Sequence, residues 1–269
     1  MSKADPGDFE RRFREILADP NNKLIPRVAE AGKIEDGFLT MHNGLQVAMG
    51  DYAYYGAFAQ ILEINGGVHE PQEELVFTEV LKYIPEGGTI VELGAYWAFY
   101  SMWFLQAVSH SKAFCVEPDE HNLMAGRTNS EHNGLPIDFT QAAVGDSGIK
   151  LDDFVEEKGI DFIDILHADV QGAEIEMLAG AQKTIASGNI GYVFLGTHSQ
   201  QLHLDCTDFL TSNGFTVIAS ADYDNETFSF DGILIARYST LAGLQPMDVG
   251  SRVAEEARPG QEEDRPRSE

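Results

Sequence analysis

From residue 89 to residue 238 the sequence alternates between short apolar runs and longer runs whose apolar side chains recur at helical spacing. Short apolar runs bounded by turn residues predict buried strands, and the intervening runs of about ten or more residues predict helices. This alternation favours an α/β fold, in which a mostly parallel, doubly wound sheet carries helices on both faces. The expected strands are 89–93, 112–118, 137–145, 162–170, 192–198, 215–220 and 230–238, and the expected helices are 97–108, 120–134, 151–159, 173–187 and 202–214.

The last two expected strands, 215–220 and 230–238, are joined by the short turn DYDNET. Such a connection is too short for a crossover helix, so these strands are expected to pair as an antiparallel hairpin at one end of the sheet. The domain that carries the sheet is expected to span 71–240. It begins with an expected amphipathic helix over 71–83, with a proline in its first turn.

The segment before the sheet, residues 1–70, is expected to form an N-terminal cap. Apolar spacing predicts a helix over 8–19, and an Asn-Gly pair predicts a hairpin within 38–49. At the other end, residues 241–269 are expected to form a disordered acidic tail, because their composition is polar and charged.

Acidic residues outnumber basic ones, with 44 Asp and Glu against 18 Lys and Arg, so the formal net charge at pH 7 is −26. Nucleic acids and anionic membranes are bound by basic side chains, so this chain is expected to bind neither. The two cysteines form no zinc-binding or disulfide pattern. The sequence shows no signal-peptide pattern and no apolar run long enough to span a bilayer, and a cytoplasmic location is expected.

Polar residues recur at the carboxyl ends of five successive expected strands, the edge at which open α/β sheets bind ligands. Gly94 follows the first strand and permits a sharp turn, and the next helix offers its N-terminal N–H groups to an anion. The second strand ends in Glu117 and Pro118, and a carboxylate there can accept both hydrogen bonds of a ribose diol. The alternative for Glu117 is an ordinary surface carboxylate. The later strand ends carry Gln141 and Ala142, then Asp169, then His198.

Several motifs share a recognisable spacing. The most specific is DVQGAE followed by LAGA, at 169–181, and the next is VEPDEHN, at 116–122; VELGAYWAFYS, NGL, AAVGD and LDDF accompany them. Over roughly residues 70–240 this spacing resembles the FkbM family of S-adenosylmethionine-dependent methyltransferases. The resemblance implies a Rossmann-like class I methyltransferase fold and transfer of a methyl group, mostly to hydroxyl groups of natural products, sugars or lipids.

The resemblance also implies roles for individual residues. Glu92 and Gly94 are expected to face the methionine part of S-adenosylmethionine, Glu117 the ribose, and the segment from Gln141 the adenine. Asp169 is expected near the sulfonium and the methyl acceptor. The remaining expected cofactor contacts lie in the same segments, namely Tyr96, Ser101, Pro118, Asn122 and Ala142.

Two features depart from the pattern of the family. Its first loop usually reads Asp-x-Gly-Ala-Asn-x-Gly, whereas here Tyr96 replaces the Asn and Ala98 replaces the second Gly. Only residues 147–150 join AAVGD to LDDF, where the family usually carries a longer insert. The altered loop supports an alternative, a catalytically inactive methyltransferase-like binding or scaffold protein. A nicotinamide-dependent oxidoreductase is disfavoured, because the loop lacks the GxGxxG pattern that admits a pyrophosphate.

Methyl transfer to a hydroxyl requires an aligned acceptor oxygen and a group that takes its proton. The candidate catalytic residues are Asp169, His198 and His69, and the alternative for His198 is a strand-end histidine satisfied by backbone groups. A divalent metal such as Mg²⁺, held by Asp169, Glu174 and His198, is a further candidate because it would acidify the hydroxyl. The alternative for Glu174 is a dipole interaction in the first turn of its own helix.

The expected partner is a small-molecule or glycosidic acceptor. The aromatic run DYAYYGAF, at 51–58, is a candidate surface for it, and a core role within the cap is the alternative. A homo-oligomer is compatible with the sequence. The prediction as a whole is an S-adenosylmethionine-dependent O-methyltransferase of natural-product biosynthesis.

Overall fold

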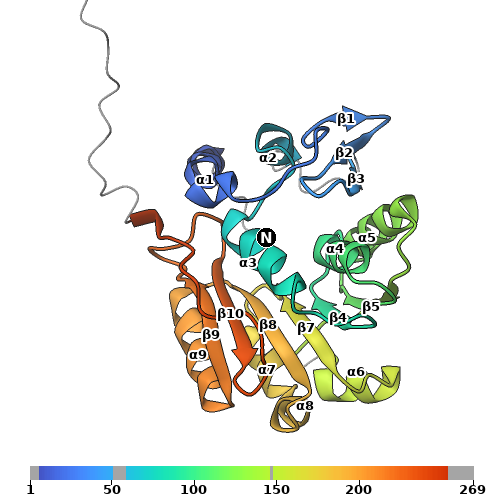
Figure 1. Ribbon diagram of the computed structural model, residues 1–269, viewed down its shortest axis with the longest axis vertical. Coiled ribbons are helices and arrows are strands. Elements are labelled where there is room, and N and C mark those ends of the chain that lie inside the picture. Colours follow the sequence, from blue (N-terminus) through green and yellow to red (C-terminus); the bar gives the residue numbers. More distant parts are fainter. Residues whose placement is uncertain (1–5, 51–58, 146–147, 254–269) are drawn as a thin grey trace, which may run out of the picture.

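The computed structural model describes residues 6–50, 59–145 and 148–253, and a seven-stranded sheet lies at its centre (Figure 1). The strand order is β6-β5-β4-β7-β8-β10-β9; β10 is antiparallel to both neighbours and the other pairs are parallel. This confirms the predicted α/β class, the mostly parallel sheet and the antiparallel C-terminal strand. The strands are β4 (Thr89–Leu93), β5 (Lys112–Val116), β6 (Asp138–Thr140), β7 (Ile163–Ala168), β8 (Ile190–Thr197), β9 (Phe215–Ala221) and β10 (Gly232–Tyr238).

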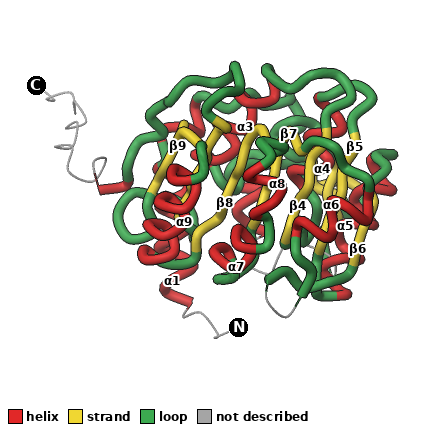
Figure 2. The backbone as a smooth tube through the Cα atoms, turned by 90° about the horizontal axis from the view of Figure 1, so that it is seen from below, coloured by secondary structure: helices red, strands yellow, loops and turns green. Residues whose placement is uncertain are grey.

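Helices cover both faces of the sheet, because successive strand residues point to opposite sides and both sides are apolar. On β4, Ile90 belongs to the core under α3 (Pro71–Leu81) and α4 (Phe99–Ala107), whereas Val91 belongs to the core on the opposite face. That opposite face is covered by α6 (Leu151–Lys158), α7 (Glu174–Ala179), α8 (Gln182–Ala186) and α9 (Gln200–Ser212) (Figure 2). No helix among the described residues is both long enough and apolar enough to cross a bilayer.

The single helix expected over 173–187 is two short helices, α7 and α8, which meet at Gly180. The break has a tertiary cause. Asp152 of α6 accepts hydrogen bonds from the backbone N–H groups of Lys183 and Thr184, at 2.9 Å each. A carboxylate from a neighbouring helix thus caps a new helix start, which the local periodicity of the sequence does not reveal.

The N-terminal cap consists of α1 (Pro6–Ala18), the 3₁₀-helix η1 (Pro20–Lys23), β1 (Ile34–Glu35), β2 (Phe38–Thr40), β3 (Gln46–Ala48) and α2 (Ala59–Ile64). The predicted hairpin is present, since β2 pairs antiparallel with β3, and β1 adds a strand that was not expected. Leu39 of the hairpin packs in the same core as Phe77 of α3. Asn129 and Asn133 of α5 (Glu120–Asn133) accept hydrogen bonds from the backbone of β3. The cap therefore shares the core of the sheet domain.

Part of the segment expected to be a disordered tail is folded onto the core. Leu244 donates its backbone N–H to the hydroxyl of Tyr192, Met247 donates its backbone N–H to Ile218, and Val249 is 2% exposed. The composition of 241–269 is polar on average, so it does not indicate that the apolar residues within this segment pack against the core. Residues 254–269 and the aromatic run 51–58 lie outside the described residues.

Candidate functional site

A cavity of about 640 Å³ opens between the cap and the carboxyl edge of the parallel strands. Ile16 of α1 and Ile61 of α2 line it from the cap, and residues that follow β4, β5, β6 and β7 line it from the sheet. Open α/β sheets bind ligands at this edge, and the volume lies in the usual range for a small-molecule site. The cavity is therefore the candidate functional site.

The structure brings many of the predicted site residues together in the wall of this cavity. They are His69, Gly94, Tyr96, Glu117, Pro118, Asn122 and Asp169. Glu92, Ser101, Gln141, Ala142, Glu174 and His198 are not part of the wall. After β6 the wall is formed by Ala143 and Val144 instead of the predicted Gln141 and Ala142. That strand ends at Thr140, earlier than expected, and two residues of loop separate it from the wall.

Gly94 allows the ends of β4 and β7 to approach each other closely. Its φ is +73°, and an added Cβ would lie 1.8 Å from the backbone oxygen of Asp169. The neighbouring strand ends are joined by the hydrogen bond from Asp169 N–H to Leu93, at 3.0 Å. Any side chain at position 94 would therefore clash with the backbone that holds Asp169 at the cavity.

Ala98, which replaces a glycine of the family pattern, adopts the left-handed conformation that glycine favours. Its φ is +60°, and its methyl group is buried with Ala95 and Cys115. It is not among the residues that line the cavity. The methyl group therefore packs inside the protein and takes no space from a ligand. Tyr96, with φ +42°, does line the cavity.

We expect Ala98→Gly to change the free energy of unfolding by less than about 1 kcal/mol. Relief of left-handed strain contributes about 1–2 kcal/mol. Loss of a buried methyl group costs about 0.8 kcal/mol, and the greater freedom of the unfolded chain costs about 0.4–1 kcal/mol. Urea unfolding measures the difference, and destabilisation beyond about 2 kcal/mol would contradict the packing role, since it exceeds these costs.

Glu92 was expected to face the methionine part of the cofactor, but its carboxylate lies inside the protein. Oε2 accepts the backbone N–H of Ser101 at 2.9 Å, in the first turn of α4. Ala98, at the N-cap position, has no polar side chain for this purpose. Glu92 thus caps the helix from the adjacent strand, and burial raises the pKa of its carboxyl group. Ser101 is likewise a fully buried structural partner.

Glu117 joins the ends of two strands at the cavity. Its carboxylate accepts hydrogen bonds from the backbone N–H groups of Tyr96 and Asp119, both at 3.0 Å, and from Asn122 Nδ2 at 3.3 Å. The side chain is 5% exposed, and burial raises its pKa. The carboxylate is fixed in the wall at the position where a ribose was expected.

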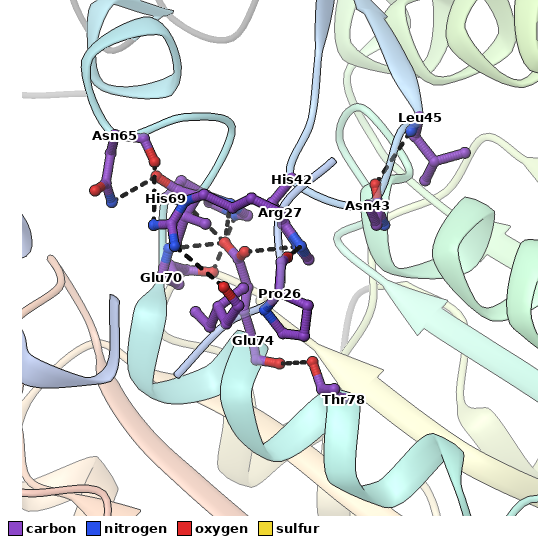
Figure 3. Close-up of polar contacts among 12 residues, drawn as sticks. Pro26, Arg27, His42, Asn43, Leu45, Asn65, His69, Glu70, Glu74 and Thr78 are labelled. Atoms are coloured by element: carbon purple, nitrogen blue, oxygen red, sulfur yellow. Dashed lines mark hydrogen bonds and ion pairs between the residues drawn. The ribbon is translucent and has the colours of Figure 1, made fainter. Parts of the chain in front are cut away.

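His69 lies at the cavity wall with a carboxylate on each side of its ring (Figure 3). Nδ1 lies 2.6 Å from Oε1 of Glu74, and Nε2 lies 3.2 Å from Oε2 of Glu70. His42 approaches the other oxygen of Glu74, with Nε2 3.0 Å from Oε2. Glu74 also accepts the backbone N–H groups of His69 and Glu70, so one buried carboxylate organises the start of α3.

Burial lowers the pKa of His69, but the charges of Glu74 and Glu70 outweigh this effect and raise the pKa to about 10. At neutral pH the ring carries both protons, so His69 is a fixed cation and not the free proton acceptor that the sequence suggested. Glu70 lines the cavity beside it, and its Oε2 also accepts the hydroxyl of Tyr100 at 3.1 Å.

A second polar group forms where three neighbouring strands end. Nε2 of His198, after β8, lies 3.2 Å from Oδ1 of Asp169 and 3.3 Å from Oδ1 of Asp231. Asp169 follows β7, and Asp231 precedes β10, which runs antiparallel and therefore begins at the same edge. Burial lowers the pKa of His198, but its bonds to Asp169 and Glu174 raise it to about 11.

Glu174 lies behind this group, away from the cavity wall. It is fully buried, and its Oε1 lies 2.6 Å from Nδ1 of His198 and accepts the backbone N–H of Gly172 at 2.9 Å. Glu174 thus fixes the orientation of the His198 ring. It contacts Nδ1, on the side of the ring opposite to the Nε2 atom that faces Asp169 and Asp231. The predicted trio of Asp169, Glu174 and His198 does not converge on one point.

Several cavity residues carried no signal in the sequence. The cap supplies Arg11, Arg12, Ile16 and Ile61, and the loop between β9 and β10 supplies Tyr223, Ser229, Phe230 and Asp231. These positions depend on how distant segments pack. Asp231 directly precedes a strand expected to be antiparallel, which places it at the same edge of the sheet as the residues that follow the parallel strands.

The comparisons with known proteins identify a family. A family model described as the methyltransferase FkbM domain matches residues 60–217, which is more than half of the chain. No curated protein matches significantly. A solved structure of a Rossmann-superfamily protein from Streptococcus agalactiae is 20% identical over 64% of this chain and 70% of its own, with a TM-score of 0.43.

Two methyltransferases are also among the similar solved structures. M. capricolum TrmK, in complex with S-adenosylhomocysteine, is 16% identical over 61% of this chain and 67% of its own, with a TM-score of 0.43. Precorrin-6y C5,15-methyltransferase from Geobacter metallireducens is 15% identical over 62% of this chain and 89% of its own, with a TM-score of 0.47. The family match spans the motifs at the ends of β4 to β8. The chain therefore belongs to the FkbM family of S-adenosylmethionine-dependent methyltransferases.

Proposed function

We propose that this protein transfers the methyl group of S-adenosylmethionine to a hydroxyl oxygen of a small-molecule or glycosidic acceptor. The observation that carries the proposal is a cavity with two kinds of wall. One part contains the Gly94 loop and Glu117, and the other contains Ile16, Phe230 and the carboxylate of Glu70. A donor and an acceptor can therefore occupy one enclosed space.

The first part of the wall fits S-adenosylmethionine. Gly94 brings backbone atoms of the loop after β4 into the cavity wall, and the buried carboxylate of Glu117 suits a ribose diol. Ala143 and Val144 offer a small, apolar surface for a flat ring. When bound, the cofactor supplies a methyl group made electrophilic by the sulfonium. The residues of the chain hold this group in position and exclude water.

The second part of the wall suits an uncharged, hydroxylated acceptor. Tyr223 and Phe230 present aromatic side chains, on whose faces sugar rings and other apolar surfaces pack. Glu70 and Asp169 bring carboxylate oxygens that accept hydrogen bonds from hydroxyl groups. Arg12 lines the same region, and its positive charge partly balances the negative charge of these two carboxylates.

The proton of the acceptor hydroxyl has to leave as the new O–C bond forms. Glu70 is our candidate for the group that takes it, because its carboxylate lines the cavity and is fixed by His69 and Tyr100. Asp169 also lines the cavity and stays a candidate. In this arrangement the cationic His69 positions Glu70 and does not itself contact the hydroxyl.

The alternative of an inactive scaffold rested on the altered first loop. Ala98 packs inside the protein and not in the cavity, which removes half of that argument. Tyr96 lines the cavity together with Gly94 and Glu117. An active enzyme is therefore the better supported reading.

Calorimetric titration with S-adenosylmethionine tests the cofactor half of the proposal. We expect Glu117→Ala to weaken binding by at least about 100-fold, because two hydrogen bonds to a charged group are lost. Glu120→Ala, which removes an exposed acid three residues away, should leave the affinity unchanged. Glu117→Gln should also bind weakly, but it places an NH2 group against one of these N–H donors. Urea unfolding of each variant therefore separates loss of the ribose contact from loss of structure. Equal affinities for wild type and Glu117→Gln would contradict the assignment.

The acceptor half is tested with methyl-labelled cofactor and a panel of sugars, glycosides and phenols, with amines and thiols as controls. Labelled methyl ethers are the expected products. Labelled products only from the amine or thiol controls would refute O-methylation while leaving the cofactor site intact.

A further inference from the structure

We propose that Asp169, His198 and Asp231 bind one divalent metal ion at the wall of the cavity. The use of this ion in catalysis rests on the proposed function, but its binding can be measured without knowledge of the acceptor.

The geometry of the three side chains suits an ion. One ligand atom from each residue, two carboxylate oxygens and the imidazole Nε2, lie within 4.8 Å of one another. They come from the same edge of three neighbouring strands, β7, β8 and β10, so rigid elements hold them together. Imidazole nitrogen with carboxylate oxygen is a ligand set that accepts divalent first-row metals such as Mn²⁺.

The buried carboxylate of Glu174 provides a second, independent observation. It holds Nδ1 of His198 at 2.6 Å and is itself fully buried, so Nε2 is left to face Asp169 and Asp231. Metal-binding histidines almost always donate their other ring N–H to a carboxylate, a backbone carbonyl or a water molecule. Glu174 therefore has the position of the outer partner, which corrects the ligand trio expected from the sequence.

The contacts around Nε2 also differ from those of a satisfied ion pair. Two carboxylates approach this single nitrogen, at 3.2 and 3.3 Å, while the contact on the other side of the ring is much shorter. One N–H group cannot donate a good hydrogen bond to both oxygens. A cation between the three ligand atoms would displace the proton from Nε2 to solvent and satisfy both carboxylates. The side chains are partly exposed, so an ion can reach them.

An ion at this point would contact the acceptor. Asp169 and Asp231 both line the cavity. A metal ion with open coordination positions binds substrate oxygens and lowers the pKa of a bound hydroxyl group. The site therefore favours acceptors that present two neighbouring hydroxyl groups, as a diol does, over acceptors with an isolated hydroxyl.

Mn²⁺ binding to the full chain, freed of metal with EDTA, tests the proposal by electron paramagnetic resonance. We expect one site per chain that is clearly tighter than the rest. Asp231→Asn, His198→Gln and Glu174→Gln should each weaken it by at least about 10-fold. Asp224→Asn, in an exposed acid outside the cavity, should leave it unchanged. If wild type and Asp231→Asn bind Mn²⁺ alike, the binding reflects the acidity of the whole chain and the proposal is wrong.

Two further measurements keep the result interpretable. Pulsed resonance should detect the nitrogen of His198 as a ligand of Mn²⁺ in wild type but not in His198→Gln, and its absence from wild type refutes the site. S-adenosylmethionine titrations on the same samples separate the two proposals. Cofactor binding without a Mn²⁺ site overturns the metal proposal alone, and a Mn²⁺ site without cofactor binding supports the metal proposal and overturns the proposed function.

Discussion

Gly94→Ala should destabilise the fold by more than about 3 kcal/mol, since a left-handed alanine alone costs about 1–2 kcal/mol and a backbone clash is added. The added Cβ would lie 1.8 Å from the oxygen of Asp169. Relief requires β4 and β7 to move apart, which displaces Asp169 from the cavity. Chemical denaturation measures the loss of stability, and calorimetry should show weaker cofactor binding in whatever protein remains folded.

Gly87→Ala provides a matched control. Gly87 has a similar φ, +81°, but an added Cβ there would meet nothing within 4 Å. This substitution should cost only the left-handed strain, about 1–2 kcal/mol. If the two variants lose equal stability, the close approach of the strand ends is not what requires glycine at position 94.

Glu74→Ala is the second substitution with a large expected effect. It should destabilise the protein by about 3–5 kcal/mol, because removal of one partner leaves buried charges uncompensated. His42, His69 and two backbone N–H groups all depend on this carboxylate, which is fully buried (Figure 3). Glu79→Ala, on the same helix, removes a partly exposed carboxylate that pairs with Lys82 at the surface. The control should stay within about 0.5 kcal/mol of wild type.

The pH dependence identifies the mechanism of this loss. The pKa of His69 is raised from 6.5 to about 10 in the folded protein. The stability that its proton contributes is therefore complete below pH 6.5 and is lost as the pH rises to about 10. In Glu74→Ala the pKa of His69 should fall, and stability should decline less steeply over this range. A variant with the wild-type slope would show that the carboxylate acts by packing alone.

The sheet was predictable because its signals are local. Strand 89–93 was located at its true bounds from an apolar run between a turn and a glycine, and the antiparallel end followed from a short connection. Gly94 and Glu117 were placed at the cavity by their positions after strands. The carboxyl ends of parallel strands lie at the same edge of the sheet, so residues that directly follow such strands in the sequence lie close together in space.

The remaining site residues depend on tertiary contacts that have no local signature. Glu92 lies within β4, two residues before Gly94, and its buried carboxylate accepts the backbone N–H of Ser101 at the start of α4. Asp231 enters the site only because β10 lies between β8 and β9. Arg12 reaches the cavity through the docking of α1, which involves residues far away in the sequence. Such contacts are set by the fold as a whole.

The docking of α1 also bears on the order in which the cavity can assemble during synthesis. Arg12 donates a hydrogen bond to the backbone of Ser229, at 2.7 Å, and lies over the ring of Phe230. Asn21 donates to the backbone of Val249, and Glu15 pairs with Arg252. These contacts of α1 and of the 3₁₀-helix that follows it can form only after residues 229–252 have been synthesised. A nascent chain arrested before residue 229 would lack these partners, so the side of the cavity that α1 contributes should be completed late in synthesis.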